Sequence, residues 1–192
     1  MRLLGILAGV VVLGLGACST SSSISKASPA DLYNRLLSTS IPDSSLPPKV
    51  QFVGTLVATN ISGAIGVVRV QFHDADPTIT DTLDYLVYSS DSEARNAYLL
   101  GKPVACPPPA GDAQPCGSAN LVAPSGFKGE AYCEAPDNSP ALCAVRDGTV
   151  VIEASSVSFT NNPAPASPYL GLVDRSESLA LAAESHLRSV GG

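Results

Sequence analysis

The sequence predicts an α+β domain in which helices pack on one face of an antiparallel sheet. Two observations predict this class. Short turns join most of the β-rich stretches, and strands joined in this way pair antiparallel. The order strand-strand-strand-helix also occurs twice along the chain, so we expect the helices to cover one face of the sheet. The two halves form a possible pseudo-repeat, although they share no evident residue-level identity.

The first half begins with a predicted helix and a predicted hairpin. The helix follows Ser28, a residue type favoured at the N-cap, with Pro29 at its first position, and it ends before Ile41. Two β-rich stretches, 50–59 and 65–73, come next and are joined by a sequence rich in turn-forming residues. We therefore expect these two stretches to pair with each other.

A third strand and a capped helix complete the first half. Residues 82–88 alternate between apolar and polar side chains, which indicates a half-buried strand. Ser90 and Glu93 form a capping-box pattern, and Gly101 ends the predicted helix. The strand phases place a set of larger polar residues on the sheet face away from the helices: Arg69, Gln71, Tyr88 and Arg146.

The second half repeats this order. The predicted strands are 130–135, 141–146 and 149–155, with Asp147-Gly148 as a type I′ turn between the last two. Pairing about that turn sets Val145 opposite Val150. It also directs six residues to the core: Ala141, Cys143, Val145, Val150, Ile152 and Ala154. The last helix is expected to begin near Asp174 and to end at the C-terminus.

The first 17 residues have the features of a secretory signal peptide. Arg2 precedes an apolar stretch from Leu3 to Leu15, and small residues follow it. The stretch is about 13 residues long, whereas a helix that spans a bilayer needs roughly 20. We therefore expect residues 1–17 to be a signal peptide rather than a permanent membrane span.

The motif Leu15-Gly16-Ala17-Cys18 resembles the lipobox of bacterial lipoproteins. The resemblance implies that the signal is cut before Cys18 and that the Cys18 thiol carries diacylglycerol, with acyl chains such as palmitate. Two or three chains would hold the protein at a membrane, since one chain anchors only marginally. The expected location is the extracytoplasmic face of the cell membrane, within the cell envelope. The alternative is a plain signal peptide that leaves Cys18 unmodified.

The composition fits an anchored domain outside the cytoplasm. Residues 18–29 are rich in serine and predict a lipidated, flexible tether. Residues 30–192 are long enough for a single domain with its own core. The formal net charge of −6, with only 11 Lys and Arg residues, argues against a nucleic-acid partner, because nucleic acid requires a basic face.

Four cysteines remain once Cys18 is set aside, and they predict two disulfides. Three connectivities are possible in principle. A turn centred on Asn138 places Cys133 opposite Cys143, within disulfide range for an antiparallel pair. Cys106 would then pair with Cys116 across a proline-rich loop. Zinc is the alternative, but its usual close C-x₂₋₄-C spacing is absent.

No residue carries a recognisable catalytic signal. The G-x-S-x-G, P-loop, H-E-x-x-H and C-x-x-C motifs are absent. His73, Asp74 and Asp76 are weak candidates for a cation loop, but they lack the EF-hand spacing, so we predict no metal and no cofactor. His186 is expected on the surface of the last helix.

These observations favour a non-enzymatic binding or envelope-assembly protein. Its expected partners are the membrane, through the lipid on Cys18, and an unidentified envelope protein or small apolar ligand. The alternative is an envelope hydrolase with an unrecognised site. Titratable groups that converge in a deep pocket would favour the enzyme, whereas an apolar cavity would favour binding.

Overall fold

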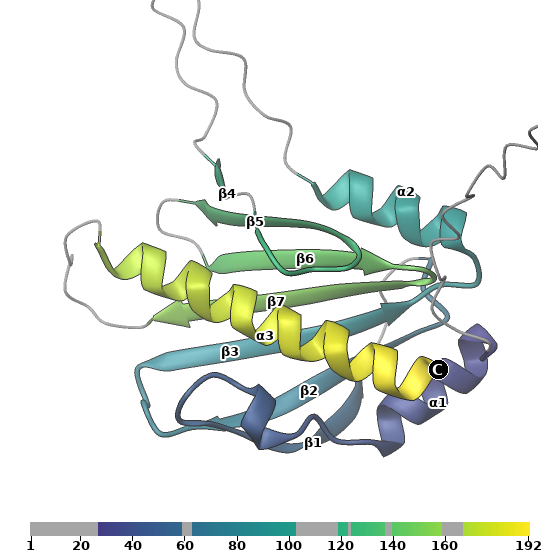
Figure 1. Cartoon of the computed structure of the whole chain (residues 1–192), viewed down its shortest axis with the longest axis horizontal. Helices are drawn as coiled ribbons and strands as arrows, with labels where there is room; N and C mark the ends of the chain where they lie inside the picture. The colour runs from purple at the N-terminus through teal and green to yellow at the C-terminus, as the bar shows by residue number, and fades with distance from the viewer. Residues whose placement is uncertain (1–26, 59–62, 103–118, 123, 137–139, 159–166) are drawn as a thin grey trace, which may run out of the picture.

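The computed structural model describes six stretches of the chain, and Figure 1 draws the other residues in grey. Within the described part, seven strands form one sheet and three α-helices pack against it. No helix of this part is long and apolar enough to cross a membrane. The described stretches are residues 27–58, 63–102, 119–122, 124–136, 140–158 and 167–192.

The elements follow the expected alternation of strands and helices. The first half contains α1 (Pro29–Ser38), the short 3-10 helix η1 (Asp43–Ser45), β1 (Val50–Ala58), β2 (Gly66–Asp74), β3 (Ile79–Val87) and α2 (Asp91–Gly101). The second half contains β4 (Ala119–Val122), β5 (Glu130–Pro136), β6 (Ala141–Asp147), β7 (Val150–Ser158) and α3 (Ser167–Gly191). Strand β4 was not predicted.

The strands are arranged in the order β1-β2-β3-β7-β6-β5-β4 (Figure 1). Every neighbouring pair is antiparallel. The strand order follows from hairpins on each side of a central β3–β7 pair, which joins the two halves of the chain. The predicted α+β class with an antiparallel sheet is confirmed.

Helices cover both faces of the sheet. On one face, α1 and α3 lie over the main core, which includes Leu83 and Ile152. On the other face, Ala94 and Tyr98 of α2 pack against a smaller cluster that includes Val151. The expectation that all helices share one face is therefore wrong for α2. Runs of consecutive apolar residues in the central strands explain the difference, because they leave apolar side chains on both faces.

The pseudo-repeat holds for the strands but not for the helices. The orders β1-β2-β3 and β5-β6-β7 mirror each other about the central β3–β7 pair. A two-fold axis normal to the sheet would relate the two sets of strands, and it would keep each helix on the same face. Because α2 and α3 lie on opposite faces, the two halves are not related by that symmetry.

One of the two predicted disulfides is confirmed. Cys133 of β5 lies directly opposite Cys143 of β6, their Cα atoms are 4.1 Å apart, and a disulfide joins them. Both side chains are fully buried in the main core. The predicted Cys106–Cys116 pair lies outside the described residues.

The turn between β6 and β7 differs from the prediction by one residue. Asp147 pairs with Val150, so Gly148 and Thr149 form the turn, and Val145 lies opposite Ile152. Gly148 has a φ of 57°, and a positive φ at the first of two turn residues is typical of type II′. The six predicted core residues are nevertheless all buried, because the register difference of two residues preserves the face of each side chain.

The predicted helix starts are confirmed at two of three positions. The Ser28 and Ser90 hydroxyls accept hydrogen bonds from the backbone N–H groups of Asp31 and Glu93. Helix α3 begins at Ser167, one turn or more before the expected start near Asp174. Pro168 does not prevent this, since a proline in the first helical turn costs no intrahelical hydrogen bond.

Candidate functional site

A buried ion-pair network ties α3 to the sheet. The Arg175 guanidinium donates from Nε to Asp81 Oδ1 (2.9 Å) and from Nη2 to Asp81 Oδ2 (2.6 Å). Nη2 also contacts Asp74, and the Ser156 hydroxyl donates to Asp81 Oδ1 (2.7 Å). The network therefore joins the third turn of α3 to the ends of β2, β3 and β7.

Both carboxylates are ionic partners of one guanidinium. The side chains of Asp81, Asp74 and Arg175 are 1%, 8% and 14% exposed. The hydrogen bond that Arg175 donates to Asp81 is the main cause that raises the pKa of Arg175 above its ordinary value, and the charges of Asp81 and Asp74 add to it. One positive charge is thus held by two buried negative charges, which leaves the cluster with an excess of negative charge.

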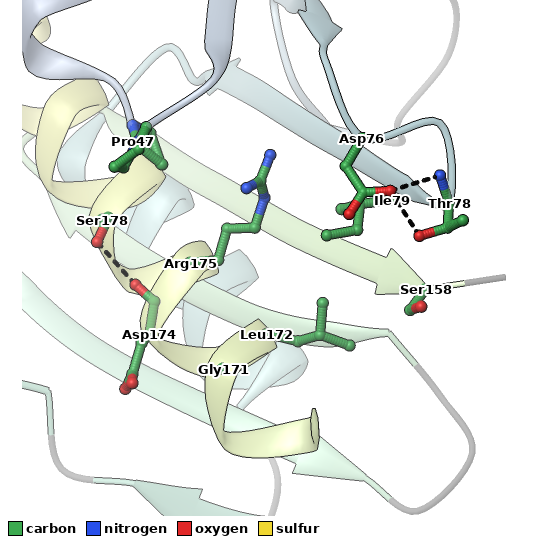
Figure 2. Close-up of a pocket in the computed structure, with 11 residues that line it drawn as sticks. Pro47, Asp76, Thr78, Ile79, Ser158, Gly171, Leu172, Asp174, Arg175 and Ser178 are labelled. Atoms are coloured by element: carbon green, nitrogen blue, oxygen red, sulfur yellow. Dashed lines mark hydrogen bonds between the residues drawn. The ribbon is translucent and has the colours of Figure 1, made fainter. Parts of the chain in front are cut away.

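A hollow of about 640 Å³ lies beside this network. Figure 2 shows it between α3, the segment before β1 and the turn between β2 and β3. Its walls include the apolar side chains of Pro47, Pro48, Ile79 and Leu172. The polar residues that line it are Asp76, Thr78, Ser158, Asp174, Arg175 and Ser178.

Asp76 stands at the edge of the hollow in a defined conformation. Its Oδ1 accepts hydrogen bonds from the backbone N–H (3.0 Å) and the hydroxyl (2.7 Å) of Thr78. These bonds, the hydroxyl first, lower the pKa of Asp76 below its ordinary value. In Figure 2 Asp76 and Arg175 stand across from each other, and one carboxylate oxygen of Asp76 is turned toward Thr78. Asp76 is therefore an ionised group that a ligand in the hollow could contact.

The three weak metal candidates have separate environments. His73 is exposed on β2, the Asp74 carboxylate bonds Arg175, and Asp76 bonds Thr78. In the described part of the chain, no group of three or more His, Cys, Asp or Glu side chains is placed to hold a metal ion. The acidic residues of this turn instead hold a guanidinium.

His186 is buried, which corrects the prediction that it lies on the surface. The residue is only 7% exposed, and burial lowers its pKa below the ordinary value. Its Nε2 lies 3.1 Å from Thr39 Oγ1, beside a second hollow of about 470 Å³. The Thr39 hydroxyl donates to Arg35 O (2.7 Å), so His186 Nε2 must be the donor to Thr39. His186 therefore does not act as a base toward this hydroxyl.

The predicted polar face is confirmed, but α2 covers part of it. Arg69 bonds Asp84 through two hydrogen bonds (2.7 and 2.8 Å) and Gln71 is exposed. Tyr88 is buried in the cluster under α2. Arg146 pairs with Asp91 of that helix (2.5 Å) and with Glu130. This face is thus occupied by internal ion pairs at several points.

Comparisons with known proteins give no family. No family model matches the chain, and no curated protein matches it. Among solved structures, the crystal structure titled Ara h 8.0201 aligns over 87% of this chain and 94% of its own, with 13% identity and a TM-score of 0.24. That similarity is too low to carry an argument about fold or function.

The sequence reasoning missed Arg175, the central residue of the network. A signal was present, because Arg175 lies between Leu172 and Leu179 at the three- and four-residue spacing of one helix face. Those two leucines are buried. A charged residue within such an apolar stripe indicates a buried ion pair, and His186 falls in the same stripe relative to Ala182 and Ala183.

Proposed function

We propose that this protein is a lipoprotein anchored through Cys18 to the extracytoplasmic face of a membrane, and that its domain binds a small ligand without catalysing a reaction. The proposed binding site is the hollow beside Arg175. We infer the anchoring from the sequence Leu15-Gly16-Ala17-Cys18. The proposed acyl chains on Cys18 are of the palmitate kind.

The Cys133–Cys143 disulfide supports a location outside the cytoplasm. Disulfides persist in oxidising compartments and are rare where thiols are kept reduced. This bridge is fully buried in the main core, where solvent reductants do not reach it directly. The proposed signal peptide would deliver the chain to such a compartment.

The hollow supports binding rather than hydrolysis. Its apolar walls suit a ligand with an apolar part, and the charged groups at its floor are bonded to one another. Two of the hydroxyls that line it have defined acceptors: Thr78 donates to Asp76 (2.7 Å), and Ser178 donates to Asp174 O (2.7 Å). An envelope hydrolase is the second candidate, and it would need a nucleophile paired with a general base at a substrate in the hollow.

The anchoring is tested by replacing Cys18. Cells that express the wild type or Cys18→Ser are supplied with labelled palmitate, and the membrane fraction is analysed for label and protein. We expect the wild type to carry the label in membranes and Cys18→Ser to lose the label. The matched control Ser19→Ala leaves the cysteine in place and should behave as wild type. Equal labelling of Cys18→Ser and the wild type would refute the lipoprotein assignment.

The binding role is tested by native mass spectrometry of the protein released from membranes. A small molecule that co-purifies, and whose occupancy falls when Leu172→Gln makes the wall of the hollow polar, would support it. Binding that is unchanged by this substitution would place the ligand elsewhere. Circular dichroism of the variant separates a local effect from loss of the fold.

A further inference from the structure

We infer that the hollow beside Arg175 selects small organic cations, in which an amine or quaternary ammonium group is joined to an aliphatic or aromatic body. This inference rests on the proposed function, because it specifies the ligand class of the same hollow. The argument uses the size of the hollow, its walls and the sign of the charge that surrounds it.

The size and the walls define the body of the ligand. A volume of about 640 Å³ lies within the range of roughly 300–1,000 Å³ that small-molecule sites occupy. Leu172 and Ile79 present apolar side chains from α3 and β3, and Pro47 closes the side nearest β1 (Figure 2). A ring or short alkyl chain would therefore exchange water for apolar contact here.

The floor of the hollow does not offer a free positive charge. Arg175 is bonded to two carboxylates, and the bonds to Asp81 use both Nε and Nη2. An anionic ligand that bonded Nη1 would lie beside a guanidinium whose charge Asp81 and Asp74 already oppose. The cluster carries an excess of negative charge and like charges repel, so the network disfavours anions.

The edge of the hollow offers a negative charge. Both hydrogen bonds from Thr78 go to Oδ1 of Asp76, so Thr78 does not occupy Oδ2. Lys49 and Arg175 also act on Asp76 electrostatically. Four carboxylates (Asp74, Asp76, Asp81 and Asp174) thus stand against Lys49 and Arg175, and the balance around the hollow is negative. A cationic group beside Asp76 would offset that charge while its body contacts Leu172 and Ile79.

The test uses three probes that share one body and differ in charge: phenethylammonium, phenethyl alcohol and 3-phenylpropionate. The full lipid-anchored protein is held in nanodiscs of zwitterionic lipid, and each probe is titrated. Methyl NMR signals of Ile79 and Leu172 report binding in the hollow. We expect the cation to shift both signals at the lowest concentration, the alcohol at a higher one and the anion at the highest.

Two substitutions that each remove one negative charge distinguish a local electrostatic effect from a general one. Asp76→Asn removes the charge and keeps an Oδ1 that Thr78 can bond, so the turn should remain folded. Glu134→Gln removes one negative charge from β5, on the sheet face opposite α3. We expect Asp76→Asn to weaken cation binding about fivefold, as for a solvent-accessible ion pair, and Glu134→Gln to leave it unchanged.

The outcomes distinguish this inference from the proposed function. If the alcohol or the anion binds as tightly as the cation, the charge selectivity is wrong although the hollow still binds ligands. An equal loss in Glu134→Gln would also overturn it, since the effect would then be general. If none of the probes shifts Ile79 or Leu172, both the inference and the assignment of the hollow fail. The Cys18 anchoring remains a separate test.

Discussion

Two arginines of α3 bond carboxylates of the sheet, one in each half of the helix, and their surroundings differ. Arg175 lies in a network with Asp74 and Asp81, next to the larger hollow. Arg188 bonds Asp147 and lies 3.5 Å from Glu184. Its Nε is buried and has no hydrogen-bond partner among the described residues. Thus the Nε of Arg175 has a carboxylate partner, whereas the buried Nε of Arg188 has none among the described residues.

The neighbours of each arginine explain this difference. Near Arg188, the Glu184 carboxylate accepts backbone hydrogen bonds from Lys128 (3.0 Å) and Gly129 (2.6 Å). Glu184 therefore holds the segment before β5. Asp147, the other partner of Arg188, is partly buried, and this burial raises its pKa. Near Arg175, both aspartates direct their carboxylates to the guanidinium. Near the C-terminal end of α3, Glu184 holds the backbone of Lys128 and Gly129 before β5. Near the N-terminal end, two aspartates surround the charge of Arg175, and the hollow lies beside them.

The largest expected effect is that of Arg175→Met. The substitution removes the only guanidinium of the network and leaves Asp74 and Asp81 buried close together, which costs about 3–5 kcal/mol. Arg188→Met should cost less, about 1–2 kcal/mol, because Arg188 is more exposed and already carries one unsatisfied donor. Urea unfolding of both variants measures the two costs. If Arg188→Met proved the more damaging, the contrast between the two ends would be wrong.

Two glycines near the ends of α3 should respond to alanine with opposite signs. A Cβ at Gly129 would lie 2.3 Å from Arg146 O and 3.2 Å from Glu184 Oε1, so Gly129→Ala should cost about 1–3 kcal/mol or more. A Cβ at Gly171 meets no atom within 4 Å. Because Gly171 lies inside a helix, Gly171→Ala should stabilise by about 0.5–1 kcal/mol. Thermal unfolding compares the two, and the same sign for both would contradict the difference in packing.

A smaller loss is expected when the Ser156 hydroxyl is removed. Ser156 is fully buried and donates to Asp81 Oδ1 (2.7 Å), so Ser156→Ala should cost about 1–2 kcal/mol. Ser185, exposed on the C-terminal half of α3, serves as the control, and Ser185→Ala should change stability little. Chemical denaturation at neutral pH measures both. No loss in Ser156→Ala would mean that Arg175 alone satisfies Asp81.

The pH dependence of stability should show the burial of His186. Burial lowers the pKa of His186 in the folded protein, so the unfolded chain binds its proton more readily. The free energy of unfolding is then highest above the unfolded pKa of about 6.5 and falls as the pH drops below it. His186→Gln removes this titration and retains an N–H that can donate to Thr39. The free energy of unfolding of the wild type should fall relative to that of His186→Gln from pH 8 to pH 5.5, and a constant difference between the two proteins would contradict the assignment.

Local sequence patterns predicted the Cys133–Cys143 disulfide and most of the secondary structure of the described residues. The turn about Asn138 gave the Cys133–Cys143 pairing because an antiparallel register depends only on symmetry about the turn. The register about Gly148 was wrong by two residues because two neighbouring dipeptides are both acceptable turn centres. Asp147 remains in the strand, where its carboxylate contacts Arg188. Such a long-range contact is not visible in the turn sequence.

The candidate site could not be predicted because its parts are far apart in sequence. Asp74 and Asp81 precede Arg175 by about a hundred residues, and only the β3–β7 pairing and the path of α3 bring them together. The acidic turn was recognised as a possible cation loop, and the cation it holds is a side chain of the protein. His186 was placed on the surface because its neighbours Glu184 and Ser185 are polar, although Glu184 is itself buried.

The hydrogen bond from Arg35 to Val190 O (2.8 Å) joins α1 to the last turn of α3, so the first helix and the C-terminus meet at one corner of the described part (Figure 1). The proposed tether enters the domain at α1. The hollow lies near Arg175, 16 residues before Gly191, which corresponds to about 24 Å along a helix. A lipid on Cys18 would keep the α1 corner within the reach of the tether from the bilayer, whereas the hollow lies toward the other end of α3. A solute could reach it there without approaching the headgroups.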